Sequence, residues 1–310
     1  MNTIDQLCLK GKRVLIRVDF NVPLNKNLII TDDSRIVAAL PTIKKVISDG
    51  GKAIIISHLG RPKNGFEEKF SLKNTSNHLA KLLKIPVGFS NDCIGKITTS
   101  DVEKMNNGDV RVLENLRFYS EEKNGDTGFA KKLAAFGDVY INDAFGTAHR
   151  AHASTSIITK FFTNNKYFGF LFAKEVNCLK KVLSITEKPF TAIIGGAKIT
   201  GKIDVIKALL NKVDNLIIGG GMAYTFAKAI GGDIGKSLVE NKKVTQAKIL
   251  INEAKNKGVN LLLPIDSVNA DDFNNTANTN ISNILSIDKN YMGLDIGNKS
   301  ITKFSDIIKE

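Results

Sequence analysis

Short runs of apolar and β-branched residues alternate with longer amphipathic stretches along most of the chain. The apolar runs predict buried strands at residues 13–20, 52–57, 110–115 and 139–144, and helical spacing predicts helices at 33–48, 71–83 and 127–136. Pro41 lies inside the first helical stretch, so the pattern predicts either a kinked helix or two shorter helices there. Strands that alternate with helices indicate βαβ units, and therefore a mainly parallel sheet with helices on both faces.

The alternation is interrupted after residue 144 and then returns. Residues 168–184 have apolar positions at helical spacing over a long span, and no strand separates them from the preceding stretch. Strand-like runs follow at 190–196, 215–221 and 260–266, whereas 269–283 is polar and rich in Asn, which predicts a loop. The pattern predicts an α/β fold with two doubly wound parallel-sheet (Rossmann-like) domains joined by a long helix. We expect an N-terminal domain at 1–168 and a C-terminal domain at 169–310 that begins with this helix.

Composition indicates a soluble protein of about two domains. The chain has 310 residues, of which 43% are hydrophobic and 24% charged. Its first residues form no apolar signal core, and no run approaches the roughly 18 apolar residues that span a bilayer, so we expect no membrane partner and a cytoplasmic location. The net charge of +13 would suit a nucleic acid or an anionic ligand, but the lysines are spread over the whole chain, which disfavours nucleic acid.

Polar side chains follow each predicted strand of the N-terminal half. The carboxyl ends of parallel strands share one edge of the sheet, where ligands bind. The stretches after the four strands, together with the start of the first helix, contain Asp19, Asn21, Arg35, His58, Arg61, Arg117 and Arg150. Guanidinium groups bind phosphate and carboxylate through paired hydrogen bonds, so this set predicts a site for a small ligand with several negative charges.

The C-terminal half has glycine at the corresponding places. Its first strand ends in Gly195, Gly196, Ala197 and Lys198, and its second in Gly219, Gly220 and Gly221. Glycine lets a ligand lie directly against the backbone, and the amino terminus of a following helix attracts phosphate, so these ends predict a nucleotide site. A polyanion site in one half and a nucleotide site in the other predict phosphoryl transfer between two domains that close on their ligands.

Residues 193–204, IIGGAKITGKID, leave a second interpretation open. Gly196, Gly201 and Lys202 have the spacing of a P-loop, G-x-x-x-x-G-K-[ST]. Ile203 stands at the final position, where it offers no hydroxyl group to a magnesium ion. The pattern therefore disfavours a P-loop NTPase without removing it.

Longer motifs identify the family that the sequence resembles. They are VLIRVDFNVPL, SHLGRPK, LENLRFY, VYINDAFGTAHRAHAST, IIGGAKI, LIIGGGMAYTF, GKSLVE and MGLDIG, in this order. Over the whole chain the sequence resembles phosphoglycerate kinase. The resemblance implies a glycolytic enzyme that transfers the acyl phosphate of 1,3-bisphosphoglycerate to ADP, reversibly, giving 3-phosphoglycerate and ATP. It also implies Mg²⁺ carried with ADP or ATP, no metal ligands from the protein, and a monomer in the cytoplasm.

The resemblance assigns roles to residues by position. It implies that the triose phosphate binds to Asp19, Asn21, Arg35, His58, Leu59, Gly60, Arg61, Arg117 and Arg150. Arg35 and Lys198 would be catalytic, since Arg35 would neutralise the phosphoryl group in transfer and Lys198 would follow it. The nucleotide would lie against Lys202, Gly219, Gly220, Gly221 and Gly293. No general base stands out, and none is needed, because the phosphoryl acceptor is a phosphate or carboxylate that is already ionised at neutral pH.

The sequence departs from the family pattern at a few places. Thr200 and Gly201 stand where the family usually has Ser-Asp, and Tyr291 stands where Trp is common. The segments with which family members continue are not in the sequence as given, so the resemblance implies an incomplete second domain with an exposed sheet edge. An alternative function follows, a catalytically impaired fragment that retains only 3-phosphoglycerate binding.

Overall fold

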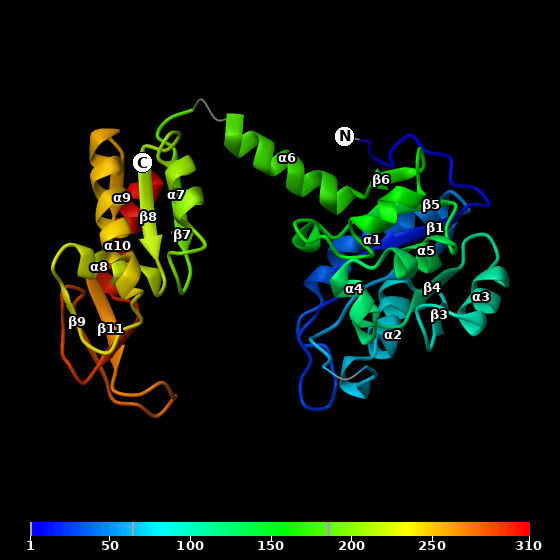
Figure 1. The fold of residues 1–310 in the computed structure, drawn as a ribbon, viewed down its shortest axis with the longest axis horizontal. Coiled ribbons are helices and arrows are strands. Elements are labelled where there is room, and N and C mark those ends of the chain that lie inside the picture. The colour runs from blue at the N-terminus through cyan, green and yellow to red at the C-terminus, as the bar shows by residue number, and fades with distance from the viewer. Residues whose placement is uncertain (1, 64, 185–186) are drawn as a thin grey trace. The chain divides into compact units, whose positions relative to one another are not determined.

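The computed structural model of the chain describes residues 2–63, 65–184 and 187–310, and the chain forms two compact units, residues 1–181 and 182–310 (Figure 1). The division lies near the end of helix α6 (Phe170–Ser184), C-terminal to the predicted boundary at 168/169. The start of α6 packs on the first unit, because Phe172 is buried and its N–H group donates to Asp143 Oδ1 over 3.0 Å. The first turns of this helix therefore belong structurally to the first unit.

A six-stranded sheet forms the centre of the first unit. Its strands are β1 (Arg13–Arg17), β2 (Lys52–Ile56), β3 (Val87–Ser90), β4 (Val110–Leu113), β5 (Val139–Asn142) and β6 (Lys166–Phe168). They lie in the order β3-β4-β2-β1-β5-β6, and all neighbouring pairs are parallel. The chain starts in the middle of this sheet and adds strands on both sides, so the carboxyl ends of all strands share one edge.

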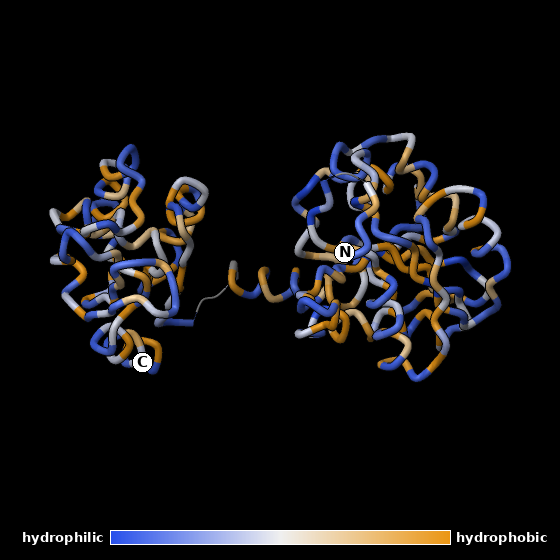
Figure 2. Tube along the Cα trace, turned by 90° about the horizontal axis from the view of Figure 1, so that it is seen from below, coloured by the Kyte–Doolittle hydropathy of each residue, from blue (hydrophilic) through white to orange (hydrophobic). Residues whose placement is uncertain are grey.

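Helices cover both faces of this sheet. They are α1 (Ser34–Ser48), α2 (Lys73–Leu83), α3 (Lys96–Glu103), α4 (Ser120–Asn124) and α5 (Thr127–Ala134). Val14 and Ile16 of β1 share a core with α1 and α2, whereas Leu15 shares one with α3 and α5, as the two-residue period of a strand requires. Figure 2 shows the apolar positions gathered inside this unit. Helix α1 continues through Pro41, so it is one helix and not two.

The second unit has a smaller parallel sheet. Strands β7 (Thr191–Gly195), β8 (Asn215–Gly219) and β10 (Asn260–Leu262) lie in the order β10-β8-β7. Helices α7 (Ile203–Leu209), α8 (Met222–Ala229) and α9 (Val244–Asn256) pack on one face, and α10 (Asn298–Lys309) packs on the other. The predicted doubly wound arrangement is therefore confirmed in both units. Ile193 pairs in register with Ile217 on the α10 face, but it is 64% exposed, so β7 has an uncovered apolar position at the sheet edge.

Further strands extend the second unit. Strand β11 (Asp266–Ala270) pairs antiparallel with β12 (Thr279–Asn283) and with β14 (Met292–Ile296), whereas β9 (Asp233–Ile234) and β13 (Ser286–Ile287) pair in parallel. The prediction of a loop over 269–283 is wrong at both ends, because β11 and β12 form a hairpin there. Buried Asn269 donates from Nδ2 to Asn280 Oδ1 over 2.8 Å across the two strands. Amide groups that pair in this way explain why an Asn-rich segment forms strands.

Candidate functional site

The predicted triose-binding residues lie at adjacent strand ends of the first unit. Asp19 and Asn21 follow β1; His58, Leu59, Gly60 and Arg61 follow β2; Arg117 follows β4; Arg150 follows β5; and Arg35 lies in the first turn of α1. Because β4, β2, β1 and β5 are neighbours in the sheet, one edge collects the whole set. The sequence-based prediction of a shared edge is confirmed for these strands.

An ion pair joins the β1 end to helix α1. Arg35 Nη1 lies 2.9 Å from Asp19 Oδ2, and the arginine side chain is 50% exposed whereas the carboxylate is 18% exposed. A guanidinium group has five N–H donors, so this pair leaves most of them available to a ligand. A cavity of about 340 Å³ opens beside the pair, and Gly146 and Leu171 are among the other residues that line it. Asp19 therefore orients Arg35 next to a space that a small ligand can enter.

His58 is a neutral hydrogen-bond donor in this site. Its side chain is buried, and Arg17 Nη2 lies 3.1 Å from its Nδ1. Because a guanidinium group only donates, Nδ1 accepts this hydrogen bond and the ring proton lies on Nε2. Burial lowers the pKa of His58 far below its usual range, and the positive charges of Arg17, Arg117 and Arg150 lower it further. The group that His58 can offer to an anion is therefore a neutral Nε2–H.

The depressed pKa of His58 predicts that the first unit loses stability at acidic pH. The unfolded histidine binds a proton below a pH of about 6.5 while the folded one does not, so the free energy of unfolding should fall by about 1.4 kcal/mol per pH unit below 6.5. Urea unfolding at two pH values in this range should show a smaller fall for His58→Gln, while His149→Gln, at an exposed histidine, should resemble the wild type. An unchanged pH dependence in His58→Gln would contradict this account.

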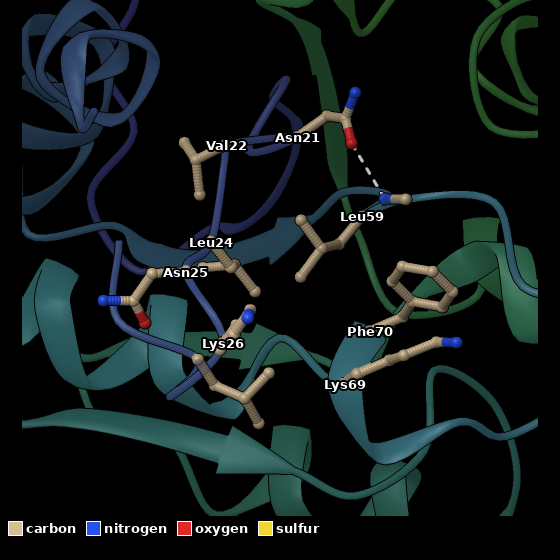
Figure 3. A pocket seen from close by; sticks show the side chains of 10 residues that line it. Asn21, Val22, Leu24, Asn25, Lys26, Leu59, Lys69 and Phe70 are labelled. Atoms are coloured by element: carbon tan, nitrogen blue, oxygen red, sulfur yellow. Dashed lines mark hydrogen bonds between the residues drawn. The ribbon is translucent and has the colours of Figure 1, made fainter. Parts of the chain in front are cut away.

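Gly60 connects the β2 end to the ends of β1 and β4. Its N–H group donates to Asn21 Oδ1 over 2.8 Å, as Figure 3 shows, and its carbonyl accepts from Arg117 Nη1 over 2.7 Å. Gly60 has a φ of +62°, and the ring of Phe70 occupies the space that a Cβ would take. Only glycine fits this position without strain, so the spacing of the two loops is fixed. A cavity of about 350 Å³ lies beside this hydrogen bond, with Leu59 and Phe70 in its wall.

Arginine side chains give this edge an excess of positive charge. Burial lowers the pKa of Arg117, and the charges of Arg150 and Arg17 lower it further, so the three guanidinium groups interact electrostatically. Arg117 Nε is buried and has no hydrogen-bond partner within the described residues. Arg150 is exposed and donates from Nε to His149 Nε2 over 3.3 Å, and Arg61 is also exposed. Like charges in a partly buried site repel one another, and a ligand with several negative charges removes this cost.

Sequence reasoning missed the buried groups that support His58. Arg17 is fully buried, and its Nε donates to Ser154 Oγ over 2.9 Å. Ser154 Oγ in turn donates to Glu122 Oε1 over 2.6 Å, and Glu122 is also fully buried. The carboxylate and the guanidinium offset each other's buried charge through the shared hydroxyl group. Arg17 could have been found, because a charged residue inside the apolar run 13–20 needs a buried partner, but no pattern distinguishes Glu122 from Glu121.

In the second unit, glycines let the ends of β7 and β8 approach each other. The Gly196 carbonyl accepts from the Met222 N–H group over 2.8 Å. Gly220 has a φ of +67°, and a Cβ on it would lie 2.9 Å from the Gly196 nitrogen. A Cβ on Gly219, by contrast, would meet nothing within 4 Å. Gly220 therefore serves backbone packing, whereas Gly219 borders open space that a ligand can enter.

Gly219→Ala should separate nucleotide binding from folding. The added methyl group has room in the free protein, so the free energy of unfolding should change by no more than about 0.5 kcal/mol. A nucleotide that lies against this backbone, as the resemblance implies, would meet the methyl group, so KM for ATP should rise several-fold. Steady-state kinetics with either substrate varied would measure this, and KM for 3-phosphoglycerate serves as the internal control. An unchanged KM for ATP would show that the nucleotide does not approach Gly219.

The two lysines of the β7–α7 turn have different surroundings. Lys198 is exposed, and Lys202 immediately precedes α7 and is partly buried. Lys202 Cε lies 3.6 Å from the position that a Cβ on Gly196 would take, so its side chain passes over the Gly196 backbone. Lys202 is thus placed beside the glycines, and Lys198 projects into solvent.

Gly293, in β14, lies in a different environment from Gly219. It is buried, its N–H group donates to Ser237 Oγ over 2.9 Å, and the ring of Tyr224 occupies the space beside it. Tyr224 OH in turn lies 2.9 Å from Ser267 Oγ. A ligand at Gly293 would therefore lie beside the Tyr224 ring as well.

The described parts of the chain contain neither a metal-binding cluster nor a membrane-spanning helix. Within residues 2–63, 65–184 and 187–310, no three His, Cys, Asp or Glu side chains gather in a way that could hold a metal ion. In the same ranges, no helix combines the length and the apolar character needed to cross a bilayer.

The model of the family described as "Phosphoglycerate kinase" matches residues 4–310. The chain belongs to the phosphoglycerate kinase family. It is 48% identical over 332 residues to phosphoglycerate kinase of Porphyromonas gingivalis, across 99% of this chain and 79% of that protein. It is 51% identical over 304 residues to phosphoglycerate kinase of Chloroherpeton thalassium, across 98% of this chain and 76% of that protein.

Solved phosphoglycerate kinases have the same fold. The enzyme from Coxiella burnetii matches with a TM-score of 0.79 and 38% identity, across 99% of this chain and 77% of that one. The enzyme from Pyrococcus horikoshii matches with a TM-score of 0.81 and 27% identity, across 99% of this chain and 78% of that one. Phosphoglycerate kinases are transferases of glycolysis that use ATP, so this chain is a kinase. Family membership favours the kinase over the alternative of a binding fragment, and the turn at 196–203 belongs to a phosphoglycerate kinase and not to a P-loop NTPase.

Proposed function

We propose that the first unit of this phosphoglycerate kinase binds 1,3-bisphosphoglycerate and 3-phosphoglycerate, and that the second binds ADP and ATP. The observation that carries the proposal is the cluster of Arg17, Arg117 and Arg150 around the neutral His58. This cluster suits a small ligand that carries both a phosphate and a carboxylate. The reaction is the reversible transfer of the acyl phosphate of 1,3-bisphosphoglycerate to ADP.

The triose phosphate would contact the strand-end residues of the first unit. We assign its binding to Asp19, Asn21, Arg35, His58, Leu59, Gly60, Arg61, Arg117 and Arg150. Exposed Arg61 and Arg150 can reach a ligand from solvent, whereas the backbone of Leu59 and Gly60 forms part of the wall. Asp19 acts through Arg35, which it holds at 2.9 Å.

Charge neutralisation would supply most of the catalysis. The acceptor oxygen, on ADP or on the carboxylate, is already ionised at neutral pH, so no proton has to be removed. Arg35 and Lys198 would offset the charge that spreads over the phosphoryl oxygens in transfer. Lys202, Gly219, Gly220, Gly221 and Gly293 would contact the nucleotide, and Mg²⁺ would enter with it as part of the substrate.

We also propose, from the family resemblance, that the enzyme is a cytoplasmic monomer. Its lysines are spread along the chain, so the net charge of +13 does not by itself indicate a nucleic-acid partner. Size-exclusion chromatography with light scattering would test the oligomeric state.

A coupled assay tests the proposed reaction. The purified 310-residue chain should phosphorylate 3-phosphoglycerate in an ATP-dependent manner, and Arg35→Ala should lower kcat while Lys248→Ala, at an exposed lysine of α9, should not. An absence of turnover beside an active phosphoglycerate kinase control would contradict the proposal. Calorimetry would then show whether this chain still binds 3-phosphoglycerate without binding ADP, as the fragment alternative requires.

A further inference from the structure

Glu240 is a carboxylate that binds the turn carrying Lys198 and Lys202. Its Oε2 accepts from the Ile199 N–H group over 2.6 Å and from the Thr200 N–H group over 3.1 Å, and its Oε1 accepts from Thr200 Oγ1 over 2.7 Å. These three donors lie on two consecutive residues between the two lysines. Glu240 is distant from them in sequence, so this contact does not arise from local turn geometry.

The backbone of Glu240 is itself attached to helix α8. Its N–H group donates over 3.2 Å to Oγ1 of Thr225, which is 1% exposed. The same helix begins at Met222, whose N–H group donates to the Gly196 carbonyl. The turn is therefore attached to α8 at two places, directly at Gly196 and through Glu240 at residues 199–200. The Ile199 side chain also fixes the turn, because it is fully buried in the hydrophobic core of the second unit.

The charge of Glu240 suits this role. The Thr200 hydroxyl lowers the pKa of Glu240 most, and the Thr200 and Ile199 N–H groups and the charge of Lys198 lower it further against the opposing effect of burial. The carboxylate is therefore ionised at neutral pH and accepts from all three donors.

We propose that Glu240 is a positioning residue that holds the 198–202 turn so that Lys198 and Lys202 face the nucleotide phosphates. The inference rests on the proposed nucleotide-binding role of these two lysines. Glu240 need not touch the nucleotide, because it acts through the backbone at Ile199 and Thr200. Loss of Glu240 should therefore weaken nucleotide binding and slow phosphoryl transfer, and leave triose-phosphate binding unchanged.

Glu240→Gln is the sharpest test. An amide is neutral and has one acceptor oxygen, so it can accept from both N–H groups only if its NH₂ group faces Thr200 Oγ1, which must then accept instead of donate. Loss of the negative charge weakens the hydrogen bonds to the two N–H groups, so the turn should be held less tightly. We expect KM for ATP to rise about tenfold and kcat to fall, with KM for 3-phosphoglycerate unchanged. Glu253→Gln is the matched control, because Glu253 lies in α9 of the same unit and pairs with Lys257 over 2.7 Å. It should leave all three parameters at wild-type values.

A double-mutant cycle with Thr200→Val distinguishes positioning from a general loss of stability. If Glu240 acts through this turn, the effects of Glu240→Gln and Thr200→Val on KM for ATP should be clearly less than multiplicative. An unchanged KM for ATP in folded Glu240→Gln would overturn the inference, as would an equal rise in both KM values. Lys202→Ala tests the underlying assumption separately. If it leaves KM for ATP unchanged, the proposed role of the lysines fails, whatever Glu240→Gln shows.

Discussion

Lys198→Ala should lower kcat by about a hundredfold to a thousandfold, the usual cost of removing one group that stabilises charge in a transition state. Lys198 is exposed in the free protein, so its removal leaves no cavity and should not change the free energy of unfolding measurably. A group that acts mainly on the transferred phosphoryl should alter kcat more than either KM. Steady-state kinetics with each substrate varied in turn would show this division.

Lys248→Ala provides the control for a general effect of charge. It removes the same charge from an exposed position on α9, so kcat should stay near the wild-type value. If Lys198→Ala raised KM for ATP and left kcat unchanged, Lys198 would be a ground-state nucleotide contact. A wild-type kcat and KM would remove Lys198 from the site.

Gly220→Ala should destabilise the second unit by about 2–4 kcal/mol. The φ of +67° disfavours any residue with a Cβ by about 1–2 kcal/mol, and the added atom would lie 2.9 Å from the backbone nitrogen of Gly196, which adds a packing cost. Since relief of this contact would separate the ends of β7 and β8, KM for ATP should rise as well. Urea unfolding and steady-state kinetics measure the two effects.

Gly258→Ala separates the two causes of that destabilisation. Gly258 has a φ of +70°, but a Cβ on it would meet nothing within 4 Å. It should therefore show the conformational cost alone, with KM for ATP unchanged. Equal losses of stability in the two variants would contradict the claim that close backbone packing at Gly196 requires glycine at position 220.

Much of the fold follows from the apolar pattern alone. Val14, Leu15 and Ile16 are consecutive apolar residues, and a strand with two buried faces requires such a run. The short strands β3 and β6 were not predicted, because each has few residues and none is fully apolar along its length. The hairpin of β11 and β12 was missed because Asn-rich composition is typical of loops, whereas Asn side chains pair across these strands, as Asn269 does with Asn280.

The site, too, could be predicted only in part. Residues in the loops that follow strands, such as Asp19 and Arg117, could be predicted, because topology alone brings strand ends together. Side chains that only support the site could not be predicted, because Glu122 and Glu240 lie far in sequence from the residues with which they form hydrogen bonds. The packing role of Gly220 could not be predicted either, because its φ and its approach to Gly196 are visible only in three dimensions.

The two units should bind different ligands through different residues. Calorimetric titration of the 310-residue chain with 3-phosphoglycerate and with Mg²⁺–ADP, for the wild type, Arg150→Ala and Lys202→Ala, would show this. Arg150→Ala should weaken 3-phosphoglycerate binding at least tenfold and leave Mg²⁺–ADP binding unchanged, and Lys202→Ala should do the reverse. Equal weakening of both ligands by either variant, or weakening of the opposite ligand, would contradict the assignment.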